Sequence, residues 1–220
     1  MTSPIAEDTY NQYLNALLTG DSTLCKGIVQ DLLGLNISFL DLYDHLYRRS
    51  LADVGDLWAK NMITVADEHI ATAITESLIS QLQPVSSGLE KTGQRVLISC
   101  ITSNLHQIGA KIVAGHFEQL GWDTYYLGAN MPITDLLDII DRIQPDVICL
   151  SLALVEHFKT LTLTIREIQL RHPQTPIVVG GQAFKKADPA DQQLNAFQNV
   201  HILRSINQLD HFISGFLSAK

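Results

Sequence analysis

The sequence contains few cysteines, no stripe of basic residues and no long apolar run, and each of these absences excludes a class of protein. Its three cysteines, Cys25, Cys100 and Cys149, are far apart, so they predict small core residues and neither a disulfide framework nor a cysteine-based metal site. The net charge of −8 argues against direct binding of nucleic acid. Since we find neither a secretory leader nor an apolar segment long enough to span a bilayer, we expect a cytoplasmic protein that makes no membrane contact.

The first 83 residues or so contain no convincing strand and predict a four-helix bundle. Apolar residues recur there at helical spacing in four groups, at 10–18, 24–33, 39–47 and 63–82. Turn-like breaks separate the first three groups, and Asp21 and Asn36 stand where each is expected to cap the helix that follows. Short connections between such helices are typical of a bundle.

The pattern changes after residues 83–88, whose proline, serines and glycine are typical of a linker. We expect strands at 95–101, 124–127, 146–152, 176–179 and 200–203, and helices near 107–120, 133–143, 156–171, 187–196 and 205–218. This alternation predicts an α/β domain, a Rossmann-like or flavodoxin-like five-stranded parallel sheet with helices on both faces. The expected organisation is a helical bundle at 1–83, a linker at 84–94 and the sheet domain at 95–220.

His106 is the candidate metal ligand of the sheet domain. It follows the first expected strand within Ser103–Gly109, and therefore lies at the carboxyl edge, where open α/β sheets bind their ligands. We expect Asn104 to hold one imidazole nitrogen by a hydrogen bond and leave the other free for a metal. Gly109 would allow a bulky flat ligand to approach the backbone.

Two more candidate positions face the same edge of the sheet. Ser151 ends the third expected strand, and the pair Gly180–Gly181 ends the fourth. The turn after the first strand lacks the Gly-x-Gly-x-x-Gly fingerprint of dinucleotide folds, and the sequence has no Walker-type Gly-Lys-Ser/Thr. These absences argue against NAD or FAD as the ligand.

In this order, His106, Ser151 and Gly180–Gly181 resemble the pattern of cobalamin-binding domains. Those domains carry Asp-x-His-x-x-Gly after the first strand, and Asn104 stands here in place of the acid. The stretch 127–132 also matches the family's loop after the second strand. The resemblance implies that His106 is the lower axial ligand of cobalt, that Ser151 lies against the nucleotide tail of cobalamin, and that the two glycines leave room for that tail.

The helical region carries a second resemblance. Trp58, followed after nine residues by Glu68 and His69, is similar to the signature of CarH-type cobalamin photoreceptors. This resemblance extends over about residues 10 to 215 and implies that the bundle covers the upper face of the corrin. Trp58 would pack against the adenosyl group of adenosylcobalamin, Glu68 would hydrogen-bond its sugar, and His69 would belong to the same cap. A large indole and a carboxylate that needs partners suit those roles.

Three features depart from the CarH-type pattern. Those proteins carry a MerR-like DNA-binding domain ahead of the bundle, whereas here the bundle begins almost at Met1, so we expect that part to be absent. Ala59 stands where those proteins have a histidine that takes the upper cobalt position after illumination, and alanine cannot ligate. The Asn104 amide lends less charge than a carboxylate, so we expect a somewhat weaker bond from His106 to cobalt and tighter binding after Asn104→Asp.

Three functions remain open from the sequence. The first is a stand-alone, non-enzymatic light sensor that signals through a protein partner or a change of homo-oligomer. The second is a corrinoid carrier that moves methyl groups between methyltransferases. The third is a sensor that admits another tetrapyrrole such as a bilin; no cysteine lies near Trp58 to tether one.

Overall fold

The chain divides into two compact units, residues 1–83 and 84–220. The computed structural model describes residues 3–82, 90–184 and 191–218. Most of the expected linker at 84–94, from 84 to 89, therefore lies outside the described residues.

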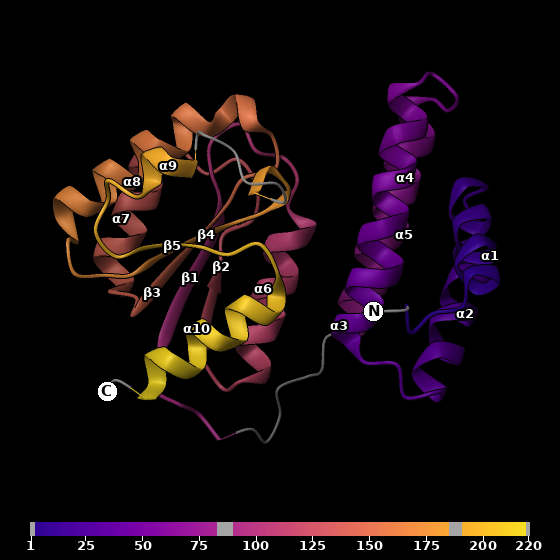
Figure 1. Ribbon diagram of the computed structural model, residues 1–220, viewed down its shortest axis with the longest axis horizontal. Helices are drawn as coiled ribbons and strands as arrows, with labels where there is room; N and C mark the ends of the chain where they lie inside the picture. The colour runs from indigo at the N-terminus through magenta and orange to yellow at the C-terminus, as the bar shows by residue number, and fades with distance from the viewer. Residues whose placement is uncertain (1–2, 83–89, 185–190, 219–220) are drawn as a thin grey trace. The chain divides into compact units, whose positions relative to one another are not determined.

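The N-terminal unit consists of helices joined by short turns (Figure 1). Its helices are α1 (Glu7–Leu18), α2 (Ser22–Gly34), α3 (Phe39–Leu42), α4 (Arg48–Ala59) and α5 (Val65–Leu82). One turn of π-helix, Tyr43–Tyr47, joins α3 to α4 without a break, so that 39–59 forms one helical segment. The expected arrangement of four helical segments is confirmed. Its buried core includes Tyr10, Tyr13, Leu17, Cys25, Val29, Leu42, Leu46, Tyr47, Val54, Ala71, Leu78 and Ile79.

One of the two expected helix caps is confirmed and the other is wrong. The Asp21 carboxylate accepts a hydrogen bond from the backbone N–H of Leu24 at 2.9 Å and caps α2. Asn36 instead adopts the left-handed conformation just after α2, with φ of 60°. The following helix is capped by Ser38, whose hydroxyl accepts from the N–H of Asp41. Asn36 fits the end of a helix because asparagine tolerates that conformation better than most residues.

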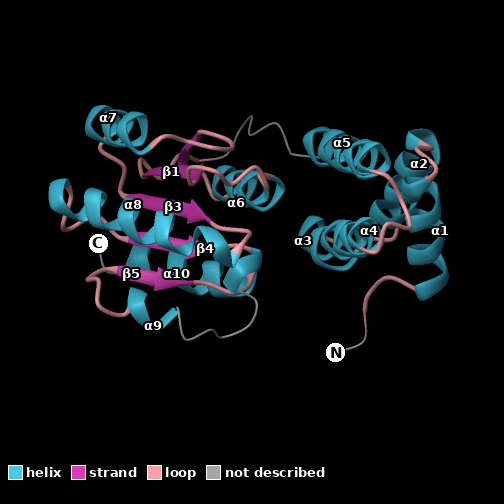
Figure 2. Ribbon diagram, turned by 90° about the horizontal axis from the view of Figure 1, so that it is seen from above, coloured by secondary structure: helices cyan, strands magenta, loops and turns pink. Residues whose placement is uncertain are grey.

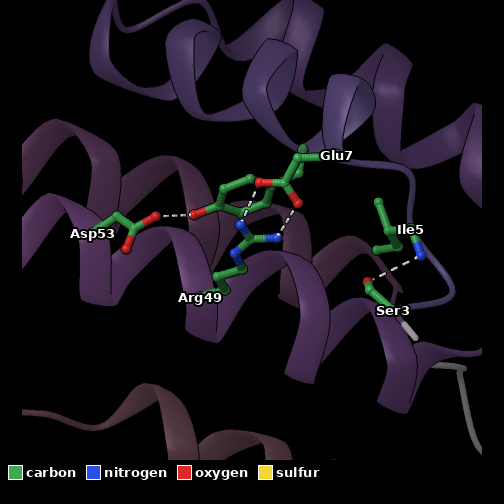
Figure 3. Close-up of polar contacts among 6 residues, drawn as sticks. Ser3, Ile5, Glu7, Arg49 and Asp53 are labelled. Atoms are coloured by element: carbon green, nitrogen blue, oxygen red, sulfur yellow. Dashed lines mark hydrogen bonds and ion pairs between the residues drawn. The ribbon is translucent and has the colours of Figure 1, made fainter. Parts of the chain in front are cut away.

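A polar cluster ties α1 to α4 (Figure 3). The Arg49 guanidinium donates to both carboxylate oxygens of Glu7, at 2.6 and 2.9 Å. It also lies 3.6 Å from the centroid of the Tyr10 ring, and the Tyr10 hydroxyl donates to Asp53. The cluster therefore joins residues more than forty positions apart in the chain.

The C-terminal unit has a parallel sheet at its centre (Figure 2). Its strands are β1 (Arg95–Cys100), β2 (Asp123–Tyr126), β3 (Val147–Ser151), β4 (Ile177–Gly180) and β5 (Val200–Ile202), in the spatial order β2-β1-β3-β4-β5. Near-continuous apolar runs in β1, β3 and β4 fit strands that are covered on both faces. The expected five-stranded flavodoxin-like sheet is confirmed.

Helices cover both faces of this sheet. One core cluster joins it to α7 (Ile133–Ile143) and α8 (Phe158–Arg171), and a second joins it to α6 (Ile108–Gln119) and α10 (Ile206–Ser218). Of the helix expected at 187–196, residues 187–190 lie outside the described residues, and α9 occupies Asp191–Leu194. None of the helices in the described part of the chain is long and apolar enough to cross a membrane.

The strand order places a switch point between β1 and β3. The chain leaves β1 toward β2 on one side and then returns to build β3, β4 and β5 on the other. Loops that leave β1 and β3 therefore diverge at their carboxyl ends, which is where sheets of this kind bind ligands. The expected ligand site lies at this edge.

Candidate functional site

The sheet brings together the three strand ends that carry the expected ligand-binding residues. In the register of the sheet, Cys100 at the end of β1 pairs with Ser151 of β3, and Ser151 pairs with Gly180 of β4. The loop with His106 follows β1 directly. His106, Ser151 and Gly180–Gly181 thus come from neighbouring strands at one edge of the sheet.

His106 presents an exposed ring on a backbone that is held from both sides. Its N–H donates to Asn104 Oδ1 at 3.3 Å, and its carbonyl accepts from Cys100 Sγ at 3.6 Å. The side chain is exposed, and within the described residues its ring makes no hydrogen bond. The protein therefore fixes the position of this residue and leaves an imidazole nitrogen available to a ligand.

Cys100 keeps its proton at neutral pH and so remains a donor to that loop. Burial is the main cause that raises the pKa of its thiol to about 11, and a hydrogen bond with the Ser151 side chain acts in the opposite direction. Cys25 and Cys149 are also free and buried. The expectation that all three cysteines are core residues is confirmed.

Asn104 does not hold the imidazole as expected from the sequence. The side chain is only 1% exposed, and its Nδ2 donates to the carbonyl of Ser151 at 2.8 Å. Its Oδ1 is taken by the backbone N–H of His106 at 3.3 Å. A buried amide must satisfy both its donor and its acceptor, and the backbone groups around Asn104 do so.

The glycines at this edge have different roles. Gly181 has φ of +116°, and a Cβ there would lie 2.3 Å from the carbonyl oxygen of Leu152. The close approach of these two backbone segments already requires a glycine, whatever binds nearby. Gly180 is less restricted, with 3.2 Å from a Cβ to the Leu203 carbonyl oxygen. Gly109 lies half-buried in the first turn of α6.

Exposed apolar side chains follow β1 and β3 at the same edge of the sheet as His106. Leu105 is 70% exposed, and Leu154 and Val155, in the loop after β3, are 40% and 48% exposed. Exposed apolar groups beside an unpartnered imidazole suit a flat apolar ligand that carries a metal. The part of the chain that the structure describes contains no group of three or more side chains able to hold a bare metal ion. A metal in a tetrapyrrole takes only axial ligands from the protein, and one imidazole meets that need.

The N-terminal unit gathers Trp58, Glu68 and His69 at one end of the α4–α5 hairpin. Trp58 lies in the last turn of α4, Glu68 lies in the first turn of α5, and His69 follows Glu68 directly. Trp58 is 49% exposed, an unusual setting for an indole. Thr72 Oγ1 donates to Glu68 Oε1 at 2.9 Å, and His69 Nε2 lies 3.6 Å from Glu68 Oε2.

Local hydrogen bonds fix the shape of that hairpin end. The N–H of Asn61 donates to the carbonyl of Trp58, and that of Met62 donates to the carbonyl of Leu57, both at 2.9 Å, which ends α4. Thr64 and Asp67 form a reciprocal cap at the start of α5. These bonds from Thr64 hold the pKa of the Asp67 carboxyl below its usual value.

Two residues of this end escaped the sequence interpretation. Met62 is 68% exposed and Val65 is 52% exposed, and both lie between Trp58 and Glu68 in the chain. Together with Trp58, they are exposed apolar residues at the hairpin end. The Thr-x-x-Asp pattern at 64–67 could have indicated them, because it marks the start of the helix that follows and therefore shows which residues lie at the turn.

Comparison with known proteins finds matches in both units. A family model described as "B12 binding domain" matches residues 94–199, and a second model with that description matches residues 9–83.

Known relatives are similar over most of the chain. HTH-type transcriptional repressor CarH of Myxococcus xanthus is 24% identical over 94% of this chain and 67% of its own length. Trimethylamine corrinoid protein of Methanosarcina barkeri is 22% identical over 62% of the chain and 64% of its own length. The solved structure of the Methanosarcina barkeri monomethylamine corrinoid protein is 12% identical, with a TM-score of 0.74 over 92% of this chain and 95% of that one. At this identity the structural likeness shows a shared fold.

Proposed function

The chain carries a B12-binding domain in each of its two units, and on that premise we propose that it binds adenosylcobalamin through His106 and acts as a light sensor. The observation that carries the binding proposal is the free, exposed imidazole on a held backbone at the carboxyl edge of the sheet. When bound, adenosylcobalamin supplies a light-sensitive cobalt–carbon bond, while the protein supplies position and readout.

In this proposal His106 is the lower axial ligand, and the edge of the sheet holds the rest of the lower face. Ser151 lies against the nucleotide tail, beside Gly180 and Gly181. Ser151 is half-buried, its carbonyl accepts from Asn104, and its hydroxyl interacts with the Cys100 thiol. In this proposal the same hydroxyl, which can both donate and accept, also faces the tail. Gly109 keeps the start of α6 free of a side chain near the ligand.

In this proposal the hairpin end of the N-terminal unit binds the upper ligand of the cofactor. Trp58 offers a large half-exposed apolar ring, and Glu68 offers a carboxylate with remaining capacity to accept hydrogen bonds. We assign Trp58 to the adenosyl group, Glu68 to its sugar, and His69 to the support of Glu68, which it approaches at 3.6 Å. A change in what Trp58 and Glu68 contact is then the signal. It reaches either a partner protein or a homo-oligomer interface.

A second candidate function is that of a corrinoid carrier for methyl transfer. The similarity to trimethylamine corrinoid protein supports it, as does the match of the whole fold to a monomethylamine corrinoid protein. A carrier must leave the upper face of its corrinoid open to a methyltransferase. The exposed indole of Trp58, with Glu68 and His69 beside it, favours the sensor because these side chains suit an upper ligand larger than methyl.

Titration with adenosylcobalamin in the dark tests the binding proposal. We expect the wild-type chain to bind, and His106→Ala to weaken binding by at least about 10-fold and to remove the spectral signature of an axial nitrogen from the protein. His211→Ala is the matched control, since His211 is an exposed histidine on α10, and we expect it to bind like the wild type. Wild-type affinity and spectrum in His106→Ala would contradict the assignment.

Illumination distinguishes the two functions. For a sensor, light changes the size-exclusion profile of the loaded protein, and Trp58→Ala reduces retention of the adenosyl form more than that of methylcobalamin. Retention of methylcobalamin alone, a profile unchanged by light and methyl exchange with a methyltransferase would establish the carrier instead.

A further inference from the structure

Asn104 is the most completely bonded polar residue at the edge of the sheet. Its N–H donates to the carbonyl of Ile101 at 3.0 Å, and its carbonyl accepts from the N–H of Asn130 at 3.0 Å. Its side chain donates to the Ser151 carbonyl at 2.8 Å and accepts from the His106 N–H at 3.3 Å. Both backbone groups and both ends of the amide are therefore engaged, in a residue that is 1% exposed.

These bonds connect three separate segments of the edge. Asn104 belongs to the loop after β1, Asn130 to the loop after β2, and Ser151 to the end of β3. Asn130 adds a second link, because its Oδ1 accepts from the N–H of Ser103 at 2.8 Å. The loop that carries His106 is thus fastened to both neighbouring strands.

The partners of the side chain require an amide at position 104. Ser151 presents an acceptor, and His106 presents a donor. An amide matches both, whereas an ionised carboxylate has only acceptors. Aspartate at this position would remove the 2.8 Å bond to the Ser151 carbonyl, which keeps a longer bond of 3.4 Å from the N–H of Ile101. It would also bring a negative charge close to that carbonyl, in a buried place where both changes are costly.

We propose that Asn104 is a positioning residue, whose Nδ2–H aims His106 by fastening its loop to β3, and that a carboxylate at this position weakens the site. The first part depends only on the protein's own contacts, while the effect on cobalamin rests on the proposed function. This reverses the expectation drawn from sequence, in which Asn104→Asp tightens binding. The difference arises because the amide contacts the backbone of the loop and not the imidazole ring.

The chain offers a matched control for the change from amide to acid. Asn130 uses its Oδ1 to accept from Ser103, and an aspartate oxygen would accept equally well. Its φ of 53° is also one that aspartate tolerates. Asn130→Asp therefore places a similar charge nearby without removing a donor, and Asn104→Ala removes both side-chain bonds without adding charge.

Hydrogen exchange of the cofactor-free protein tests the fastening. We expect the amides at 104–106 to exchange about 10-fold or more faster in Asn104→Asp and Asn104→Ala, because each change removes a buried hydrogen bond to β3. Asn130→Asp should exchange like the wild type. Unchanged exchange in Asn104→Ala would overturn the proposal even if the aspartate variant fails to fold.

Titration with adenosylcobalamin in the dark tests whether Asn104 positions His106 for binding. We expect the affinity for adenosylcobalamin to fall in the order wild type, Asn104→Ala, Asn104→Asp, with a total loss of about 10–100-fold. We also expect a smaller fraction of the bound cobalamin to show the spectrum of a protein nitrogen on cobalt. Affinity of Asn104→Asp equal to or above that of the wild type would overturn the proposal. If the wild-type chain itself ignores cobalamin, the proposed function fails, and the exchange measurement still decides whether Asn104 fastens the loop.

Discussion

Gly181 has no room for a side chain, because its backbone passes against the carbonyl of Leu152. The distance of 2.3 Å from a built Cβ to that oxygen is far inside a van der Waals contact. The backbone at Gly181 also has a φ that L-residues rarely adopt. Gly180 next to it meets only a tight contact of 3.2 Å. Position 181 therefore strictly requires a glycine, whereas position 180 only favours one.

Gly181→Ala should therefore destabilise the C-terminal unit by about 3 kcal/mol or more, since backbone strain and a backbone clash add. Gly180→Ala, the matched change one residue earlier, should cost about 1–2 kcal/mol. Urea denaturation followed by far-ultraviolet circular dichroism measures both. Equal losses in the two variants would show that the Leu152 contact does not distinguish them.

The sequence predicted which residues gather at this edge but not what each one contacts. The spacing of apolar residues located the strands, and His106, Ser151 and Gly180 each stand at or after the end of one. Because parallel strands end at a common edge, this was enough to predict that the three residues lie at the same edge of the sheet. The partners of Asn104 were not predictable, since they are the carbonyl of Ser151, 47 residues away, and a neighbouring N–H. Spacing along the chain does not show which way a buried amide faces.

Helix α1 is fastened to α4 through Arg49. The guanidinium meets Glu7 with two hydrogen bonds and lies on the Tyr10 ring. The fork of arginine supplies a geometry that lysine cannot. Burial raises the pKa of the Tyr10 hydroxyl, and its bond to Asp53 adds to that rise. The phenol therefore stays protonated and continues to donate to Asp53 across the physiological range.

Arg49→Ala should lower the stability of the N-terminal unit by about 1–2 kcal/mol, the sum expected for an exposed bidentate pair and a cation–π contact. Arg48→Ala is the control. Within the described residues, Arg48 pairs with Asp44 one turn earlier on the same helical segment, so its loss should cost about 0.5 kcal/mol or less. Thermal unfolding compares the two variants. An equal decrease of the unfolding midpoint in both would show that the contact between α1 and α4 adds no stability.

The elements were largely predictable and their junctions were not. Apolar spacing located the helices and strands because a buried face repeats with the period of its element. The π turn at 43–47 left no mark in that spacing, and Asn36 was misread because asparagine suits both ends of a helix. Junctions depend on single backbone conformations, which composition describes poorly.

At the scale of the whole molecule, the chain is two compact units, 1–83 and 84–220. Arg49 belongs to the first and Gly181 to the second, and each makes its contacts within its own unit. Changes at sites that share no partner add in free energy. We therefore expect each substitution to lower the stability of its own unit.

The double variant Arg49→Ala/Gly181→Ala tests this independence. In the cofactor-free protein we expect each substitution to shift the unfolding of its own unit, with the two losses additive within about 0.5 kcal/mol. Differential scanning calorimetry of the single and double variants measures this. A single unfolding transition whose midpoint both substitutions lower would mean that the units unfold as one.

The loop around His106 obtains its form from the protein's own groups: an amide, a thiol and the carbonyl of a neighbouring strand. Folding of the chain and binding of its cofactor are then separate events. Under the proposed function, a shortage of vitamin would leave intact cofactor-free protein, and a later supply would load it without any refolding. On that proposal, the amount of polypeptide and the amount of its cofactor-loaded form would be set independently.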